Sequence, residues 1–90
     1  MATLDNAVGG YKYKPEDFGN LTSLADDLAH FYSMLGIYNA QKTKSAHLDL
    51  EVFWCENMYF TIKQCEVMGK LAPYDAAEIR EYLEGLLYAG

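Results

Sequence analysis

The sequence is short of several residue types, and each shortage excludes a class of structure. Its 90 residues include two prolines and two cysteines. So few prolines leave long stretches free to form helices, and two cysteines are too few for the disulfide framework of a small secreted domain. No run of about 18 apolar residues occurs, so we expect no membrane span. Residues 1–10 have neither a charged start nor an apolar centre, so we also expect no signal peptide and a cytoplasmic location.

Positive charge is scarce as well. Seven lysines and arginines stand against 13 aspartates and glutamates, which gives a formal net charge of −6 at pH 7. A protein that binds nucleic acid needs a basic surface to displace counterions. We therefore predict no nucleic-acid partner, whereas a basic protein partner stays open.

Hydrophobic and aromatic residues are plentiful, at 51% and 14% of the chain. This composition is far from that of disordered proteins, so the chain should fold. A domain of this size has a marginal core unless another chain or a ligand adds to it. The sequence thus favours one small folded domain that is open to outside support.

The stretch 45–71, SAHLDLEVFWCENMYFTIKQCEVMGKL, predicts one long helix around which the other elements pack. At about 100° per residue, Asp49, Glu56, Lys63 and Lys70 fall on one narrow charged stripe. We expect this stripe to be the only clearly solvated face, because most other positions are apolar. A helix that is hydrophobic nearly all round must be covered nearly all round. The pattern therefore predicts an elongated protein or a subunit of a larger assembly.

A shorter helix should precede it. Its start is predicted between Asn20 and Thr22, where capping-type residues lie, and Gly36 is suited to end it. Residues 36–44 form either a loop or an early start of the long helix. We place that start near Ser45, because lysines are unfavourable at a helix N-terminus. The apolar residues of the first helix recur at steps of three and four, as in a helix–helix seam: Leu21, Leu24, Leu28, Phe31, Leu35 and Tyr38.

A last helix is predicted after Pro73. Asp75 and Glu78 have the spacing of a capping box, and Tyr74 and Ile79 have that of a hydrophobic staple. The fold class that follows is all-α, a small three-helix protein with a long central helix: a helical hairpin plus a short C-terminal helix. We predict an extended N-terminal arm over residues 1–19 and a single helical domain over residues 20–90.

The arm has a distinct pattern. Tyr11 and Tyr13 alternate with Lys12 and Lys14 just before Pro15, which favours extended backbone with one aromatic edge and one basic edge. Such an arm can lie along its own chain or reach a neighbouring chain. The sequence does not choose between the two.

Residues that could carry chemistry are few. His47 and Glu51 have a spacing that can bind a metal ion, but helical diiron proteins need two Glu-x-x-His motifs and further glutamates. Cys55 and Cys65 would lie about 15 Å apart along a helix, too far for a disulfide, and neither has a neighbouring base. We therefore predict no catalytic residue, no metal site and no cofactor.

Aromatic residues and methionine are typical of the centres of protein interfaces. We predict that Trp54, Met58 and Tyr59 of the long helix, with Tyr11 and Tyr13 of the arm, contact a partner chain. Three other large residues are assigned to the core: Phe53, Phe60 and Met68.

These features give three hypotheses for function. The leading one is a non-enzymatic protein–protein interaction module, a structural or accessory subunit of a larger assembly that forms a homo-oligomer. The alternative is an acidic inhibitor or immunity-type protein that blocks a basic protein surface. A metal-binding helical-bundle enzyme is the third, and only His47 and Glu51 favour it.

Overall fold

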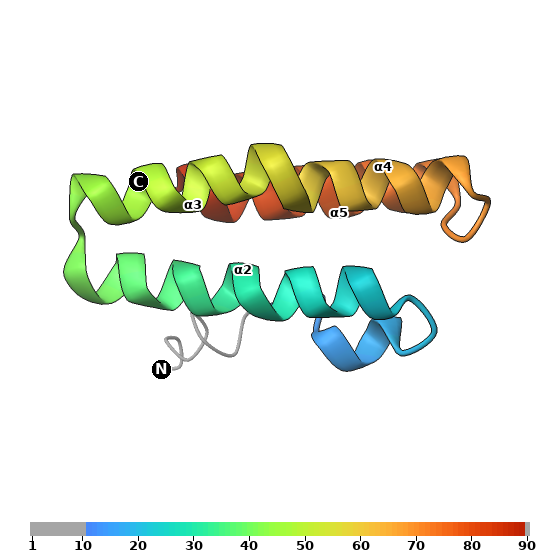
Figure 1. Ribbon diagram of the computed structural model, residues 1–90, viewed down its shortest axis with the longest axis horizontal. Helices are drawn as coiled ribbons and strands as arrows, with labels where there is room; N and C mark the ends of the chain where they lie inside the picture. The colour runs from blue at the N-terminus through green and yellow to red at the C-terminus, as the bar shows by residue number, and fades with distance from the viewer. Residues whose placement is uncertain (1–10, 90) are drawn as a thin grey trace.

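The computed structural model describes residues 11–89, which form an all-α fold without strands (Figure 1). Helix α2 spans Thr22–Gln41. A single long helix then runs from Lys44 to Val67, and we call it the joined helix. It consists of α3 (Lys44–Phe53), the π-helical turn η2 (Trp54–Met58) and α4 (Tyr59–Val67). The predicted three-helix fold with a long central helix is confirmed.

Two further elements complete the chain. Helix α5 spans Pro73–Tyr88, and a short 3₁₀ turn, η1 (Pro15–Phe18), precedes α2. Figure 1 shows α2 antiparallel to the joined helix, and α5 returning along the joined helix from α4 towards α3. The molecule measures 37 × 28 × 19 Å. It is elongated, as the length of the central helix predicts.

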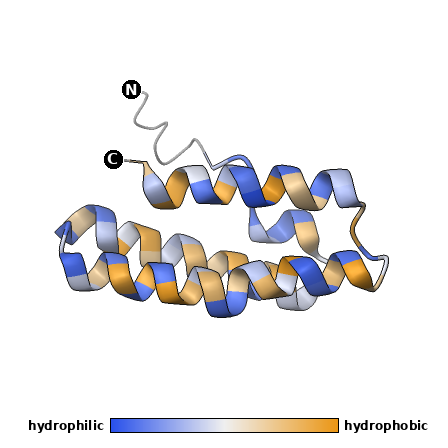
Figure 2. Cartoon of the chain, turned by 90° about the horizontal axis from the view of Figure 1, so that it is seen from above, coloured by the Kyte–Doolittle hydropathy of each residue, from blue (hydrophilic) through white to orange (hydrophobic). Residues whose placement is uncertain are grey.

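One hydrophobic core runs the length of the bundle. Apolar bands recur along every helix in Figure 2, and the side chains that face inward are buried. Because each helix contributes residues at steps of three or four, one stripe of each helix is enclosed. The buried residues are Phe18, Leu24, Leu28, Phe31, Leu35, Leu50, Trp54, Met58, Ile62, Cys65, Ala76, Ile79, Leu83 and Leu87.

The π-helical turn keeps the core stripe of the joined helix straight. Leu50, Trp54, Met58 and Ile62 are buried at strict steps of four residues. In a regular α-helix each such step rotates by about 40° from the one before, because a turn holds 3.6 residues. The wider turn η2 accommodates one extra residue. The extra residue therefore offsets the accumulated rotation, and all four side chains stay on the side of the joined helix that faces the core.

The connection after α2 differs from the prediction. Gly36 lies inside α2, which continues to Gln41, and Lys42 ends the helix in the left-handed conformation at φ 53°. The extra turn carries Tyr38 onto His47 of α3, with ring centroids 5.1 Å apart. Residues 36–44 are thus mostly helical. The joined helix begins at Lys44, close to the predicted Ser45.

The helix caps also differ from the prediction. Leu21 precedes α2 and Ala72 precedes α5, and neither side chain caps its helix. Pro73 opens α5 instead, since proline needs no hydrogen bond to its nitrogen there. The predicted capping box and staple are therefore wrong, and Tyr74 is 75% exposed.

The joined helix ends earlier than predicted, at Val67. Gly69 takes a φ of 74°. The Gly69 N–H donates to the carbonyl of Glu66 at 3.0 Å, and the Lys70 N–H donates to that of Cys65 at 2.9 Å. This bonding pattern is a Schellman motif, in which glycine fits because it has no Cβ.

Within residues 11–89, no helix combines the length and the apolar character that crossing a membrane requires.

Candidate interaction surfaces

Two sides of the joined helix are covered by the other helices. On the α2 side, the Thr61 hydroxyl donates a hydrogen bond to Asp27, and Phe53 lies 4.8 Å from the His30 ring. On the α5 side, the Arg80 guanidinium lies 5.6 Å from the Tyr59 ring. These contacts hold the joined helix between α2 and α5. The side that points away from both is left uncovered.

Large apolar side chains line this uncovered side. Leu48, Val52, Phe60 and Val67 are 50%, 51%, 57% and 76% exposed, and we call these four residues the outer face. Glu56 and Lys63 are exposed between them in the sequence. The prediction that the charged stripe is the only clearly solvated face of the helix is therefore wrong. Large exposed apolar patches on soluble proteins mark interaction sites.

The assignment of Phe60 and Met68 to the core is also wrong. Each is 57% exposed, whereas Phe53 is partly buried and packs against the core as predicted. The reason is geometric: α2 and α5 each cover one flank of the joined helix, and residues 11–89 hold no further α-helix to cover the rest.

The predicted partner residues of the joined helix are mostly internal. Trp54 is 3% exposed and Met58 is fully buried, and Trp54 packs against Phe31 of α2 with ring centroids 6.0 Å apart. They are core residues of the single chain, so they offer a partner no surface. Tyr59 is 39% exposed beside Arg80. Of the three, only Tyr59 lies at the edge of the outer face.

A groove adjoins the outer face on the α2 side. It has a volume of about 400 Å³, and it lies between the start of α2 and the C-terminal half of the joined helix. Leu21 and Thr22 form one wall, and Phe60, Gln64 and Met68 form the other. The apolar surface of the joined helix therefore continues towards α2.

The aromatic residues of the arm are placed against their own chain. Tyr11 stacks on Tyr32 of α2, with ring centroids 4.0 Å apart and planes 12° apart. Tyr13 meets Tyr82 of α5 edge to face at 5.4 Å. The Tyr32 hydroxyl also donates a hydrogen bond to the Tyr13 carbonyl. Residues 11–13 thus cover the side of the bundle between α2 and α5.

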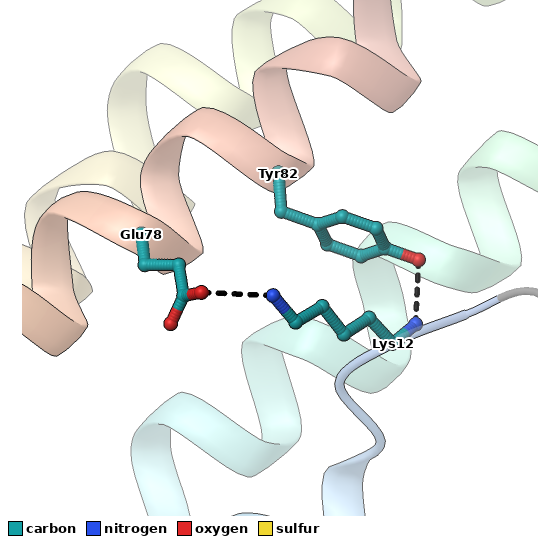
Figure 3. Close-up of polar contacts among 3 residues, drawn as sticks. All are labelled: Lys12, Glu78 and Tyr82. Carbon is teal, nitrogen blue, oxygen red and sulfur yellow. Dashed lines mark hydrogen bonds and ion pairs between the residues drawn. The ribbon is translucent and has the colours of Figure 1, made fainter.

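Lys12 ties the arm to α5 at two points (Figure 3). Its backbone N–H donates to the Tyr82 hydroxyl, and its Nζ donates to Oε2 of Glu78 at 2.9 Å. The Glu78 side chain, predicted to cap α5, is engaged by Lys12 instead. After the arm, η1 places Phe18 in the core. The last part of the predicted arm is therefore helical, while residues 1–10 of that arm lie outside the described residues.

The docked arm changes the ionisation of its tyrosines. Burial raises the pKa of Tyr11, and the nearby Tyr82 raises it further. Burial also raises the pKa of Tyr32 well above its usual value. The hydrogen bond with Lys12 lowers the pKa of Glu78, and the same bond raises the pKa of Lys12. The folded arm thus favours neutral tyrosines and a charged Lys12–Glu78 pair.

The residues considered for metal binding and catalysis have structural neighbours. The His47 ring contacts those of Tyr38 and Tyr88, with centroids 5.1 and 6.2 Å away, and the Tyr88 hydroxyl donates to Glu51 at 3.2 Å. Residues 11–89 hold no group of three or more side chains that could ligate a metal ion. Cys55 is exposed and free, while Cys65 is free and buried. Burial raises the pKa of the Cys65 thiol, which opposes a role as a nucleophile.

Sequence reasoning expected an apolar surface nearly all round the joined helix but missed which residues stay uncovered, although a signal was present. Leu48 and Val52 lie on either side of Leu50, and neighbours two positions apart on a helix point in well-separated directions. A helix with apolar residues in both directions has more apolar surface than one pair of neighbours covers.

No protein family, curated protein or solved structure matches this chain. Its own surfaces therefore carry the functional argument.

Proposed function

We propose that this chain is a non-enzymatic protein–protein interaction module, a structural or accessory subunit of a larger assembly. It associates through the outer face of the joined helix and forms a homo-oligomer. The exposure of Leu48, Val52, Phe60 and Val67 on one helix carries this proposal. Burying such side chains against another chain would stabilise a complex by about 25 cal/mol for each Å² of apolar surface removed from water.

Three further observations agree with this function. The net charge of −6 disfavours nucleic acid as a partner. The two free cysteines suit a reducing compartment such as the cytoplasm. His47 and Glu51, the side chains considered for a metal, contact tyrosines within the bundle. We propose that the protein acts by binding, without catalysis, metal or cofactor.

A second candidate function rests on the acidic surface. Asp75 and Glu81 are exposed on α5, and a surface of this kind attracts a basic protein site. An acidic inhibitor would use α5 and would lose affinity steeply with added salt. Association through the outer face would depend on apolar contact and would respond less to salt.

Substitution of one outer-face residue tests the leading function. We expect light scattering at about 100 μM to give a mass above the 10.2 kDa of the monomer, because association grows with concentration. Phe60→Ser should return the mass to that of the monomer. Tyr74→Ser is the matched control, since Tyr74 is an exposed aromatic residue that belongs to α5 and not to the joined helix. A wild-type monomer, or equal effects of both substitutions, would contradict the proposal.

A further inference from the structure

We infer that two copies of this chain pair their outer faces antiparallel, about a twofold axis that passes between Tyr59 and Phe60. This inference rests on the proposed function and adds the partner, the direction and the register. The occupant of the outer face is a second copy of the same chain. The order of charges along the joined helix supplies the argument.

The exposed charges of the stripe change sign once along the helix. Asp49 and Glu56 occupy the first half, whereas Lys63 lies in the second half and Lys70 follows the helix end; all four are exposed. Glu56 and Lys63 are equally far in sequence from the midpoint between Tyr59 and Phe60, and so are Asp49 and Lys70. An antiparallel copy centred there sets each carboxylate opposite a lysine. A parallel copy sets like charges together, which is unfavourable.

The apolar residues fit the same register. Val52 and Val67 are also equally far from that midpoint, so each valine meets the other valine of the second copy. Phe60 lies next to the axis and therefore meets its own counterpart. All three are at least half exposed in the single chain. A twofold contact of this kind is self-complementary, as isologous interfaces require.

The positions of the outermost charges agree with the twofold axis. Asp49 borders a hollow that it shares with Met34 and Ile37 of α2. Lys70 borders the groove at the start of α2. Both charges therefore lie on the α2 side of the joined helix. An antiparallel twofold contact sets the α2 side of one copy beside the α2 side of the other, so Asp49 and Lys70 meet on the same edge.

Lys63 is free to take a new partner. Within the chain its Nζ lies 3.9 Å from Oε1 of Glu66, and Arg80 lies 3.7 Å from the same oxygen. Exchanging this long, partly exposed contact costs little, since exposed ion pairs contribute about 1 kcal/mol or less. Glu66 would keep Arg80 when Lys63 turns to Glu56 of the second copy.

Charge reversal tests the pairing. Glu56→Lys sets two lysines together at two symmetric places, and Lys63→Glu sets two carboxylates together. We expect each single variant to weaken self-association about tenfold by analytical ultracentrifugation in low salt. The double variant should recover the wild-type Kd. An equimolar mixture of the two single variants should form the mixed dimer, because both of its contacts are again attractive.

Cross-linking tests the register independently. In a Cys55→Ser background, Val52→Cys and Val67→Cys are made separately and joined with a short bismaleimide. We expect a covalent dimer from the mixture of the two variants and little from either alone. Cys55→Ser by itself is the control. Covalent dimers from each single variant would establish a parallel pair and overturn the inference.

The outcomes separate this inference from the proposed function. If Phe60→Ser abolishes association while the charge variants and the cysteine pair do not follow the predicted pattern, the interaction face stands and the antiparallel pairing is wrong. If the wild-type chain stays monomeric at about 100 μM, the proposed homo-oligomer is wrong and the antiparallel pairing is wrong with it.

Discussion

The two faces of the joined helix carry similar apolar residues and differ mainly in how far other helices bury them. Its inner face carries Leu50, Trp54, Met58 and Ile62, all at most 3% exposed. Its outer face carries leucine, phenylalanine and two valines that are half exposed or more. A helix accommodates both faces with equal ease, because hydrogen bonding along its axis does not depend on what surrounds it. The inner face thus stabilises the single chain, whereas the outer face stays largely in contact with water.

A second apolar surface, by contrast, is covered by residues of the same chain. Between α2 and α5 the exposed edge of the bundle would consist of Tyr32 and Tyr82, but Tyr11 and Tyr13 of the arm lie against them. The chain covers this side with its own residues, and the described residues leave the outer face uncovered. Cover therefore separates the surfaces that stabilise the monomer from the outer face, which we propose to be the surface that binds a partner.

The largest expected difference in the free energy of unfolding is between alanine variants of two leucines on the joined helix. Leu50→Ala should lower the free energy of unfolding by about 3 kcal/mol, because it leaves a cavity in the core. Leu48→Ala should lower it by less than about 1 kcal/mol, because water already reaches half of that side chain. Urea denaturation followed by circular dichroism, at a protein concentration low enough to prevent association, measures both. Similar losses for the two variants would refute the distinction between the faces.

These two leucines also show how far the sequence could predict the structure. Periodicity predicted the long helix, its partners α2 and α5, and the buried stripe of α2, since regular spacing reports a face that is in contact. It did not tell which apolar side of the joined helix is inward. From the sequence, Trp54 was assigned to a partner interface and Phe60 to the core, but the positions of α2 and α5 place Trp54 inward and Phe60 outward.

The turn η2 and the contacts of the docked arm were beyond prediction for related reasons. The π-helical turn lies where Leu50, Trp54, Met58 and Ile62 all pack inward, and propensity does not encode such tertiary packing. The Lys12–Glu78 contact joins residues far apart in the sequence. Glu78 fits a capping box by its local spacing, but the distant contact with Lys12 is the one that forms.

Tyr11 and Tyr13 of the arm allow the same comparison between covered and exposed side chains. Replacing Tyr11 and Tyr13 together by alanine should lower the free energy of unfolding by about 2 kcal/mol, because each loses an aromatic contact and buried area. The helical far-UV signal should remain, since α2 and α5 keep their own core contacts. Tyr74→Ala is the control, because Tyr74 is 75% exposed, and its effect should stay within about 0.5 kcal/mol. Thermal unfolding measures all three chains, and an unchanged midpoint for the double variant would show that the arm adds no stability.

The smallest expected effect concerns charge, and two glutamates provide the comparison. Glu78 is bonded to Lys12, and that bond lowers the pKa of its carboxyl in the folded chain. Because the unfolded chain then binds the proton more readily, this contribution to stability is present above the unfolded pKa and is lost as the pH falls through the folded one. Glu56 is exposed in the charged stripe of the joined helix and is the matched control.

Melting temperatures between about pH 7 and pH 3 give the measurement, since carboxyl groups titrate within that range. We expect Glu78→Gln to lower the melting temperature slightly at neutral pH, and the difference from the wild type to shrink as the solution becomes acidic. Glu56→Gln should show no such trend in the monomer, because its proposed partner is Lys63 of a second copy. If Glu78→Gln and Glu56→Gln give parallel curves in dilute protein, the Lys12–Glu78 contact does not hold the arm. If the two curves diverge only in concentrated protein, and there through Glu56, the charge of Glu56 acts between chains while that of Glu78 does not.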